Sequence, residues 1–130
     1  MNKRLVILIA ERNPHIRKFI MRELLAEGYY VFSVETVSQL KKRIHLRRAV
    51  DILIIDPDLL DKEQQDLWTF LDETPEKTVI IHGLSTDQYN SNCIDRKAIL
   101  VEKSASSIFF IKNRIRQLYN FTSDGEPIDP

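Results

Sequence analysis

Acidic and basic side chains stand close together in the sequence where short apolar runs end. Glu11 and Arg12 are neighbours just after the first such run, which covers residues 5–9. Asp56 directly follows another run, and Lys103 comes soon after the last one. Carboxylates grouped with cationic side chains can pair with one another or bind a charged ligand. The positions of these four residues in the fold therefore decide what chemistry they can do.

Five short apolar runs predict β-strands. Four of them are continuous and rich in β-branched residues, which is typical of strands covered on both faces in a parallel sheet. The remaining run, the second along the chain, is more amphipathic. The predicted strands cover residues 5–9, 29–34, 51–55, 78–81 and 98–101.

Helical patterns lie between these runs. Asn13 is a favourable N-cap with Pro14 at the first helical position, and Gly28 is placed to end that helix. Two capping boxes and a serine cap predict three more helices. The capping boxes are Thr36 with Gln39 and Asp61 with Gln64, and the serine cap is Ser104 or Ser106. Over residues 85–95 a helix is expected only because a parallel crossover needs one.

This alternation predicts one α/β domain with an open, doubly wound (βα)5 sheet over residues 1–122. Residues 123–130 are expected to form a tail or the beginning of a linker. Ligands of such sheets bind outside the carboxyl ends of the strands, which is where the four charged residues lie. No glycine-rich loop follows the first strand, so the sequence does not predict a site for a nucleotide pyrophosphate.

Composition excludes several functional classes. The chain has 130 residues with 19 basic and 19 acidic side chains, so no net charge favours nucleic acid or acidic lipid. Its single cysteine, Cys93, excludes a disulfide framework and a cysteine-based zinc site. The sequence shows neither a signal-peptide pattern nor an apolar stretch long enough to span a membrane, so a cytoplasmic location is expected.

Other polar residues are assigned structural roles. The basic stretch at residues 41–48 is interpreted as the solvated face of a helix rather than as a phosphate-binding patch. His15, His45 and His82 share no spacing with acids or with the cysteine that is typical of a metal site. We therefore interpret the histidines as structural.

Four segments carry a resemblance to a known family. They read ILIAERNPHIR, DILIIDPDLL, VIIHGLS and AILVEKS, starting at residues 7, 51, 79 and 98. In this order and spacing they resemble the receiver domain of two-component response regulators, over residues 3 to about 120. That family has an acidic pair after strand one, a phosphoacceptor Asp after strand three, a Ser or Thr after strand four and a Lys after strand five.

The resemblance implies a flavodoxin-like fold with five parallel strands in the order 2-1-3-4-5. It implies that Asp56 is the phosphoacceptor and that Lys103 contacts the phosphoryl group. It also implies a Mg²⁺ ion bound by Glu11, Asp56 and the backbone carbonyl of Asp58, since Mg²⁺ prefers oxygen ligands and neutralises the charge of phosphoryl transfer. The implied role is phosphorelay signal transduction through contact with a histidine kinase, a phosphotransfer protein or another signalling protein, and not catalysis as an enzyme.

The sequence departs from the family pattern at three site positions. Arg12 stands where the family has its second acid, and Gly83 stands where it has a hydroxyl residue. Leu100 lies three residues before the lysine, where the family has an aromatic side chain coupled to that hydroxyl. A cation about 5 Å from a divalent ion costs roughly 6–7 kcal/mol at an effective dielectric constant near 20, so weak or absent Mg²⁺ binding is expected.

Two orientations of Arg12 are consistent with the sequence. Its guanidinium pairs with Asp56 or Glu11 in place of the metal, or it points into solvent. Two functions also stay open: weak phosphorylation of Asp56, and a pseudo-receiver that binds its partner without phosphorylation. A small α/β enzyme is disfavoured, because the sequence offers no nucleophile–base pair and no cofactor loop.

A homodimer or partner contact is expected on the face built by the fourth helix, the fifth strand and the fifth helix, as the resemblance implies. Phe109 and Phe110 are adjacent on the last predicted helix, so they cannot both point into the core beside Ile108 and Ile111. One of the two rings is expected to stay partly exposed as an interface anchor. The alternative is that a neighbouring helix covers both rings.

Overall fold

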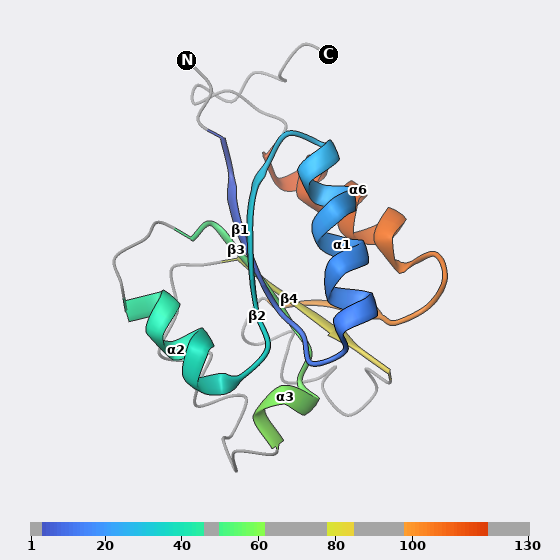
Figure 1. The fold of residues 1–130 in the computed structure, drawn as a ribbon. Helices are drawn as coiled ribbons and strands as arrows, with labels where there is room; N and C mark the ends of the chain where they lie inside the picture. Colours follow the sequence, from blue (N-terminus) through green and yellow to red (C-terminus); the bar gives the residue numbers. More distant parts are fainter. Residues whose placement is uncertain (1–3, 46–49, 62–77, 85–97, 120–130) are drawn as a thin grey trace.

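The structure, a computed structural model, describes residues 4–45, 50–61, 78–84 and 98–119 (Figure 1). Its strands are β1 (Val6–Ala10), β2 (Tyr30–Val34), β3 (Ile52–Ile55), β4 (Thr78–Gly83) and β5 (Ile99–Glu102). Its helices are α1 (Pro14–Ala26), α2 (Val37–His45), α3 (Asp58–Asp61) and α6 (Ser107–Tyr119). None of these described helices is long and apolar enough to cross a membrane. The helix expected over residues 85–95 lies outside the described residues. Asp61, expected to cap a helix, instead lies within α3, which begins three residues earlier, and the residues after it lie outside the described part.

The five strands form one parallel sheet in the order β2-β1-β3-β4-β5. This confirms the predicted flavodoxin-like, doubly wound fold. Helices α1 and α6 lie on one face of the sheet and α2 lies on the other (Figure 1). Because all five strands run in the same direction, their carboxyl ends share one edge of the sheet.

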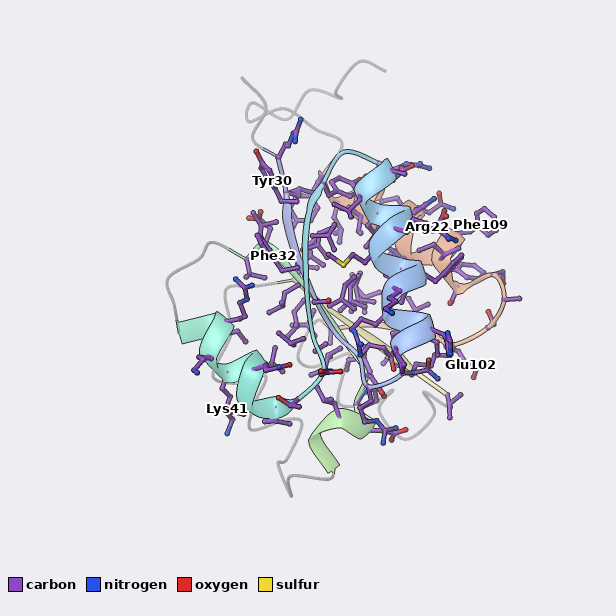
Figure 2. The ribbon with its side chains drawn as sticks, viewed as in Figure 1. Arg22, Tyr30, Phe32, Lys41, Glu102 and Phe109 are labelled. Atoms are coloured by element: carbon purple, nitrogen blue, oxygen red, sulfur yellow. The ribbon has the colours of Figure 1, made fainter. Side chains whose placement is uncertain are left out.

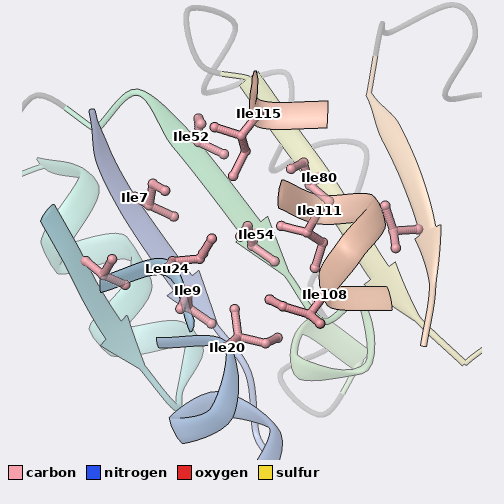
Figure 3. Close-up of a cluster of buried hydrophobic side chains, with 12 residues drawn as sticks. Ile7, Ile9, Ile20, Leu24, Ile52, Ile54, Ile80, Ile108, Ile111 and Ile115 are labelled. Carbon is pink, nitrogen blue, oxygen red and sulfur yellow. The ribbon is translucent and has the colours of Figure 1, made fainter. Parts of the chain in front are cut away.

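The side chains of the central strands are buried on both faces. Alternate residues of a strand point to opposite faces, so each face of the sheet has its own apolar layer. Figure 3 shows the layer under α1 and α6, which is made mainly of isoleucines. Its labelled members are Ile7, Ile9, Ile20, Leu24, Ile52, Ile54, Ile80, Ile108, Ile111 and Ile115. Burying one such side chain contributes about 1.5–3 kcal/mol, so this layer holds α1 and α6 on the sheet.

Both ends of α1 follow the sequence prediction. Oδ1 of Asn13 accepts the backbone N–H groups of His15 at 2.9 Å and Ile16 at 3.1 Å, which caps the first turn. Gly28 follows the helix with a φ of 95°, in the left-handed region that only glycine adopts readily. The cap sets the direction in which the chain leaves β1, and therefore the position of the two residues between β1 and the cap.

Polar contacts attach α6 to the rest of the domain. Nζ of Lys112 lies 2.8 Å from Oε1 of Glu23 on α1, and the Lys112 side chain is largely shielded from solvent. At the other end, the hydroxyl groups of Tyr119 and Thr78 lie 2.7 Å apart, which joins α6 to the start of β4. These contacts hold α6 beside α1 over the same face of the sheet.

One residue of the basic stretch at 41–48 has a packing role. The guanidinium of Arg43 on α2 lies 4.8 Å from the ring centroid of Phe32 on the edge strand β2. Figure 2 shows Phe32 on the side of the sheet that faces α2. A guanidinium stacked over an aromatic ring shields the ring from water while keeping its own charge exposed.

Strand β4 extends two residues beyond the predicted run and places a histidine in the core. His82 is 2% exposed, and its Nε2 lies 3.0 Å from Oγ of Ser107. Burial, and secondarily the nearby charge of Lys103, lower the pKa of His82 from 6.5 to about 4, against the opposing effect of Asp56. The imidazole is therefore neutral at pH 7.

This burial makes the stability of the protein depend on pH in a specific window. In the unfolded chain His82 takes up a proton near pH 6.5, whereas in the folded chain it does so near pH 4. Between these values the unfolded state binds more protons, so the free energy of unfolding falls as the pH falls. Replacing His82 by Phe keeps an aromatic ring, although a larger one, and removes the titration. We expect the free energy of unfolding of the parent, minus that of His82→Phe, to fall from pH 7 to pH 4.5. The slope in urea titrations should be up to about 1.4 kcal/mol per pH unit. A difference that stays constant over this range would contradict the assignment.

Candidate functional site

Three of the predicted site residues lie directly beyond the carboxyl ends of strands. Glu11 follows β1, Asp56 follows β3 and Lys103 follows β5. The backbone N–H of each residue extends the sheet by one further hydrogen bond to a neighbouring strand. The bonds run from Glu11 to Val34 (3.2 Å), from Asp56 to Ala10 (2.8 Å) and from Lys103 to Gly83 (2.7 Å). The sheet thus fixes the backbone from which each site side chain starts.

Lys103 connects the two buried carboxylates. Glu11 and Asp56 are each 2% exposed, and the Lys103 side chain is largely buried beside them. Nζ of Lys103 lies 3.0 Å from Oε1 of Glu11 and 3.5 Å from Oδ2 of Asp56. One amine therefore contacts two acids that would otherwise repel each other in a low-dielectric environment.

The pKa of Glu11 is raised above its ordinary value of 4.5. Burial of the carboxylate is the main cause, and the negative charge of Asp56 is the second. The hydrogen bonds that Glu11 accepts from Nζ of Lys103, and at 3.1 Å from the backbone N–H of Asn13, oppose this rise without cancelling it. The surroundings of Glu11 therefore favour its protonated form more than water does.

Arg12 lies across the site rather than pointing into solvent. Its Nε is 3.3 Å from Oδ2 of Asp56, and one terminal nitrogen is 3.3 Å from Oδ2 of Asp58. The side chain is 37% exposed, so it covers the site from the solvent side. Of the two orientations that the sequence left open, the structure shows the ion pair with Asp56, and it adds a contact with Asp58 that the sequence did not predict.

Both carboxylate oxygens of Asp56 are engaged within the chain. Oδ1 accepts the backbone N–H of Asp58 at 3.0 Å. Oδ2 is shared by the Arg12 guanidinium and the Lys103 amine. To attack phosphorus or bind a metal through Oδ2, Asp56 would first have to give up its contact with one of these cations.

Arg17 is a site residue that sequence analysis missed. Its Nη1 donates to the backbone carbonyl of Glu11 at 3.0 Å and to that of Arg12 at 3.4 Å, and its Nη2 lies 3.4 Å from Oε2 of Glu35. These contacts hold the turn between β1 and α1 in one conformation. No spacing rule relates a helix residue to two carbonyls of the preceding turn, so the sequence carried no signal for this role.

The residues expected to bind Mg²⁺ do not fit that ion in this arrangement. The expected ligands are Glu11, Asp56 and the backbone carbonyl of Asp58, and their carboxylates already contact Lys103 and Arg12. A divalent ion placed among them would lie beside two cations, which is strongly unfavourable. Among the residues that the structure describes, no three His, Cys, Asp or Glu side chains are grouped so that they could hold a metal ion.

The two degenerate switch positions lie on neighbouring strands. Gly83 ends β4, and it supplies a backbone carbonyl to Lys103 but no side-chain hydroxyl. Leu100 on β5 pairs with Ile81 and packs against the apolar layer on the face of α2. The two positions at which the resemblance implies a hydroxyl and an aromatic ring thus hold a glycine and an aliphatic side chain.

No protein-family model matches the sequence, and no curated protein matches it either. Solved structures with the same fold are response regulators. HP1043, an orphan response regulator of H. pylori, is 16% identical with a TM-score of 0.69, and the match covers 87% of this chain and 94% of that chain. TrrA from Thermotoga maritima, solved in complex with Mg²⁺ and beryllium fluoride, is 20% identical with a TM-score of 0.66, covering 88% and 98%.

Two further structures extend the similarity. A CheY-like receiver domain from Methylobacillus flagellatus is 14% identical with a TM-score of 0.69, covering 87% of this chain and 99% of that one. An atypical orphan response regulator with a phosphorylation-independent regulatory mechanism is 15% identical with a TM-score of 0.67, covering 94% and 99%. Together with the strand order and the acidic edge, these matches show that the chain has the receiver-domain fold of response regulators.

Proposed function

We propose that this domain is a signalling module that acts by protein–protein contact and does not require phosphorylation. The observation that carries the proposal is the ion pair between Arg12 and Asp56, at 3.3 Å. The guanidinium takes the Oδ2 atom that also faces Lys103, so the carboxylate is already neutralised. Arg12 thus adds a positive charge, and removes an acid, where a receiver of the usual kind binds a metal ion beside the same lysine.

Loss of the switch residues supports the same proposal. A phosphoryl group on Asp56 can change the conformation only through contacts that differ between the modified and unmodified states. Gly83 offers no hydroxyl to such a group, and Leu100 offers no aromatic ring that could follow the hydroxyl. The similar fold of an atypical orphan regulator with a phosphorylation-independent mechanism gives this proposal a precedent in the same architecture.

A second function, weak phosphorylation of Asp56 by a histidine kinase or phosphotransfer protein, is favoured by one specific observation. Lys103 lies 3.5 Å from Asp56, where it could contact a phosphoryl oxygen. Arg12 is 37% exposed, so it has room to swing toward water and admit the group. In the second function Arg12 must move away from Asp56 before that residue is phosphorylated, whereas in the first the ion pair stays in place.

We propose α6 and β5 as part of the partner or homodimer surface. Phe109 and Phe110 are 64% and 57% exposed, so both rings stay uncovered by the described part of the chain, where the sequence predicted one. Figure 2 shows Phe109 projecting from α6 away from the sheet. Exposed aromatic rings on a rigid helix are frequent anchors of protein interfaces. The fourth helix, which the expected surface includes, lies outside the described residues.

Beryllium fluoride with Mg²⁺ tests the proposal directly, because it mimics a phosphoryl group on an aspartate. We expect no saturable binding by the parent protein in calorimetry at millimolar Mg²⁺. Arg12→Asp should bind, since it removes the blocking cation and restores an acidic pair with Glu11. Without Mg²⁺ that variant should melt below the parent, and Mg²⁺ at ten times its Kd should restore about 1.4 kcal/mol.

The matched control is Arg22→Asp on α1. Arg22 is exposed and makes only a long contact with an acid, at 3.9 Å from Glu23. It makes the same change in charge and should leave the parent's behaviour unaltered. Saturable, Mg²⁺-dependent binding of beryllium fluoride by the parent would overturn the phosphorylation-independent proposal and leave phosphorylation of Asp56 as the better one.

The partner surface makes a separate prediction. Phe109→Ser should weaken self-association roughly tenfold in sedimentation experiments, because a central aromatic anchor contributes on the order of 1–2 kcal/mol. Leu118→Ser, which changes a 44% exposed residue on the same helix, is the control and should have a smaller effect. The surface is wrongly placed if parent and Phe109→Ser have the same dissociation constants for self-association and for binding to a cognate kinase.

A further inference from the structure

The turn that carries Arg12 into the acidic site needs support beyond the contacts of Arg12 itself. The Arg12 guanidinium lies 3.3 Å from Asp56 and 3.3 Å from Asp58, whereas a charge-assisted hydrogen bond is usually about 2.7–2.9 Å long. The side chain is also 37% exposed, so water competes for its donors. Long, partly exposed contacts gain little more than the rotamer entropy that is lost when an arginine is ordered. The pair with Asp56 therefore depends on a backbone that already aims Arg12 at the acid.

Arg17, in the first turn of α1, supplies this support. Its Nη1 donates to the backbone carbonyl of Glu11 at 3.0 Å and to that of Arg12 at 3.4 Å. The Arg17 side chain is only 14% exposed, and hydrogen bonds from a charged donor are roughly twice as strong as neutral ones. A rotation of either peptide group would break one of the two bonds. Arg17 thus limits the directions in which the side chain of Arg12 can leave the turn.

Glu35 holds the other terminal nitrogen of Arg17. Nη2 lies 3.4 Å from Oε2 of Glu35, which belongs to the connection between β2 and α2. The backbone of Glu35 is held in turn by Gln39, whose Oε1 accepts the N–H of Glu35 at 2.8 Å. Because Arg17 uses one terminal nitrogen for the turn and the other for Glu35, the arrangement needs the fork of a guanidinium. A lysine, with a single nitrogen, could not serve both sides equally well.

We propose that Arg17 is a positioning residue: it keeps Arg12 over Asp56 by holding the two carbonyls of the turn, and Glu35 orients it. Its action on the acid is indirect, through the backbone of Arg12. This inference rests on the proposed function, in which the pair between Arg12 and Asp56 takes the place of phosphoryl chemistry. It adds to that function the residue on which the pair depends.

Exchange of the Arg12 Nε–H with water, followed by ¹⁵N NMR, tests the proposal, because this group donates to Oδ2 of Asp56. In Arg17→Ala the exchange should be at least about tenfold faster than in the parent, since the hydrogen bonds that aim the group are lost. Arg17→Lys should restore part of the protection and lie between the two. Glu35→Ala should have an effect of only about twofold, because Glu35 is 57% exposed.

Lys112→Ala is the matched control. The Lys112 side chain is 15% exposed, which is close to the 14% of Arg17, and it also pairs with an acid, Glu23. Its removal should lower the stability of the fold and leave the exchange of the Arg12 Nε–H at the rate of the parent. A general loss of stability is thereby separated from a positioning effect.

An exchange rate in Arg17→Ala equal to that of the parent, or the same acceleration in Lys112→Ala, would overturn the proposal. If Arg17→Ala does not fold, the parent still provides a test. A held Arg17 should show separate, slowly rotating Nη groups in ¹⁵N spectra at low temperature, and rapid rotation of its guanidinium would contradict the assignment. Binding of beryllium fluoride by the parent would overturn the proposed function alone, because the exchange rate of Arg12 would still report whether Arg17 holds it.

Discussion

Two carboxylates buried side by side are the constraint on which this site depends. Glu11 and Asp56 are almost inaccessible to water, and ionised acids in such surroundings are costly unless cations lie next to them. Lys103 contacts both acids, and Arg12 contacts Asp56. The chain therefore supplies from its own side chains positive charge that offsets the two acids. Removing either cation is expected to disturb the other three residues, because all four share contacts.

The parallel sheet explains why this constraint can be met in different ways without changing the fold. The backbone of Asp56 and Lys103 is fixed by hydrogen bonds that continue the sheet, and the isoleucine layer beneath it is independent of the site. Arg12, in contrast, is partly exposed at the rim. A single substitution there changes the charge of the site by up to two units and leaves the core untouched. We propose that the residue at this position decides whether a metal ion is admitted.

Sequence patterns predicted the sheet because four of its strands are continuous β-branched runs and capped helices lie between most of them. They also placed Asp56 and Lys103 at one edge and offered the Arg12–Asp56 pair as one of two orientations. They did not predict the contact with Asp58, the carbonyl contacts of Arg17 or the pairing of His82 with Ser107. These depend on how far a side chain reaches after the elements have packed, and helix or strand periodicity carries no information about that reach.

A double-mutant cycle between Arg12 and Asp56 tests the central claim most directly, namely that the arginine neutralises the buried acid. The free energies of unfolding of the parent, Arg12→Ala, Asp56→Ala and the double variant give the coupling between the two side chains. We predict a coupling of about 1 kcal/mol or more at low ionic strength, decreasing with salt because Arg12 is partly exposed. The pair Arg22 and Glu23, 3.9 Å apart on α1 with an exposed arginine, is the control and should show a clearly smaller coupling, because Glu23 already pairs with Lys112. A coupling between Arg12 and Asp56 no larger than that of the control pair would contradict the account.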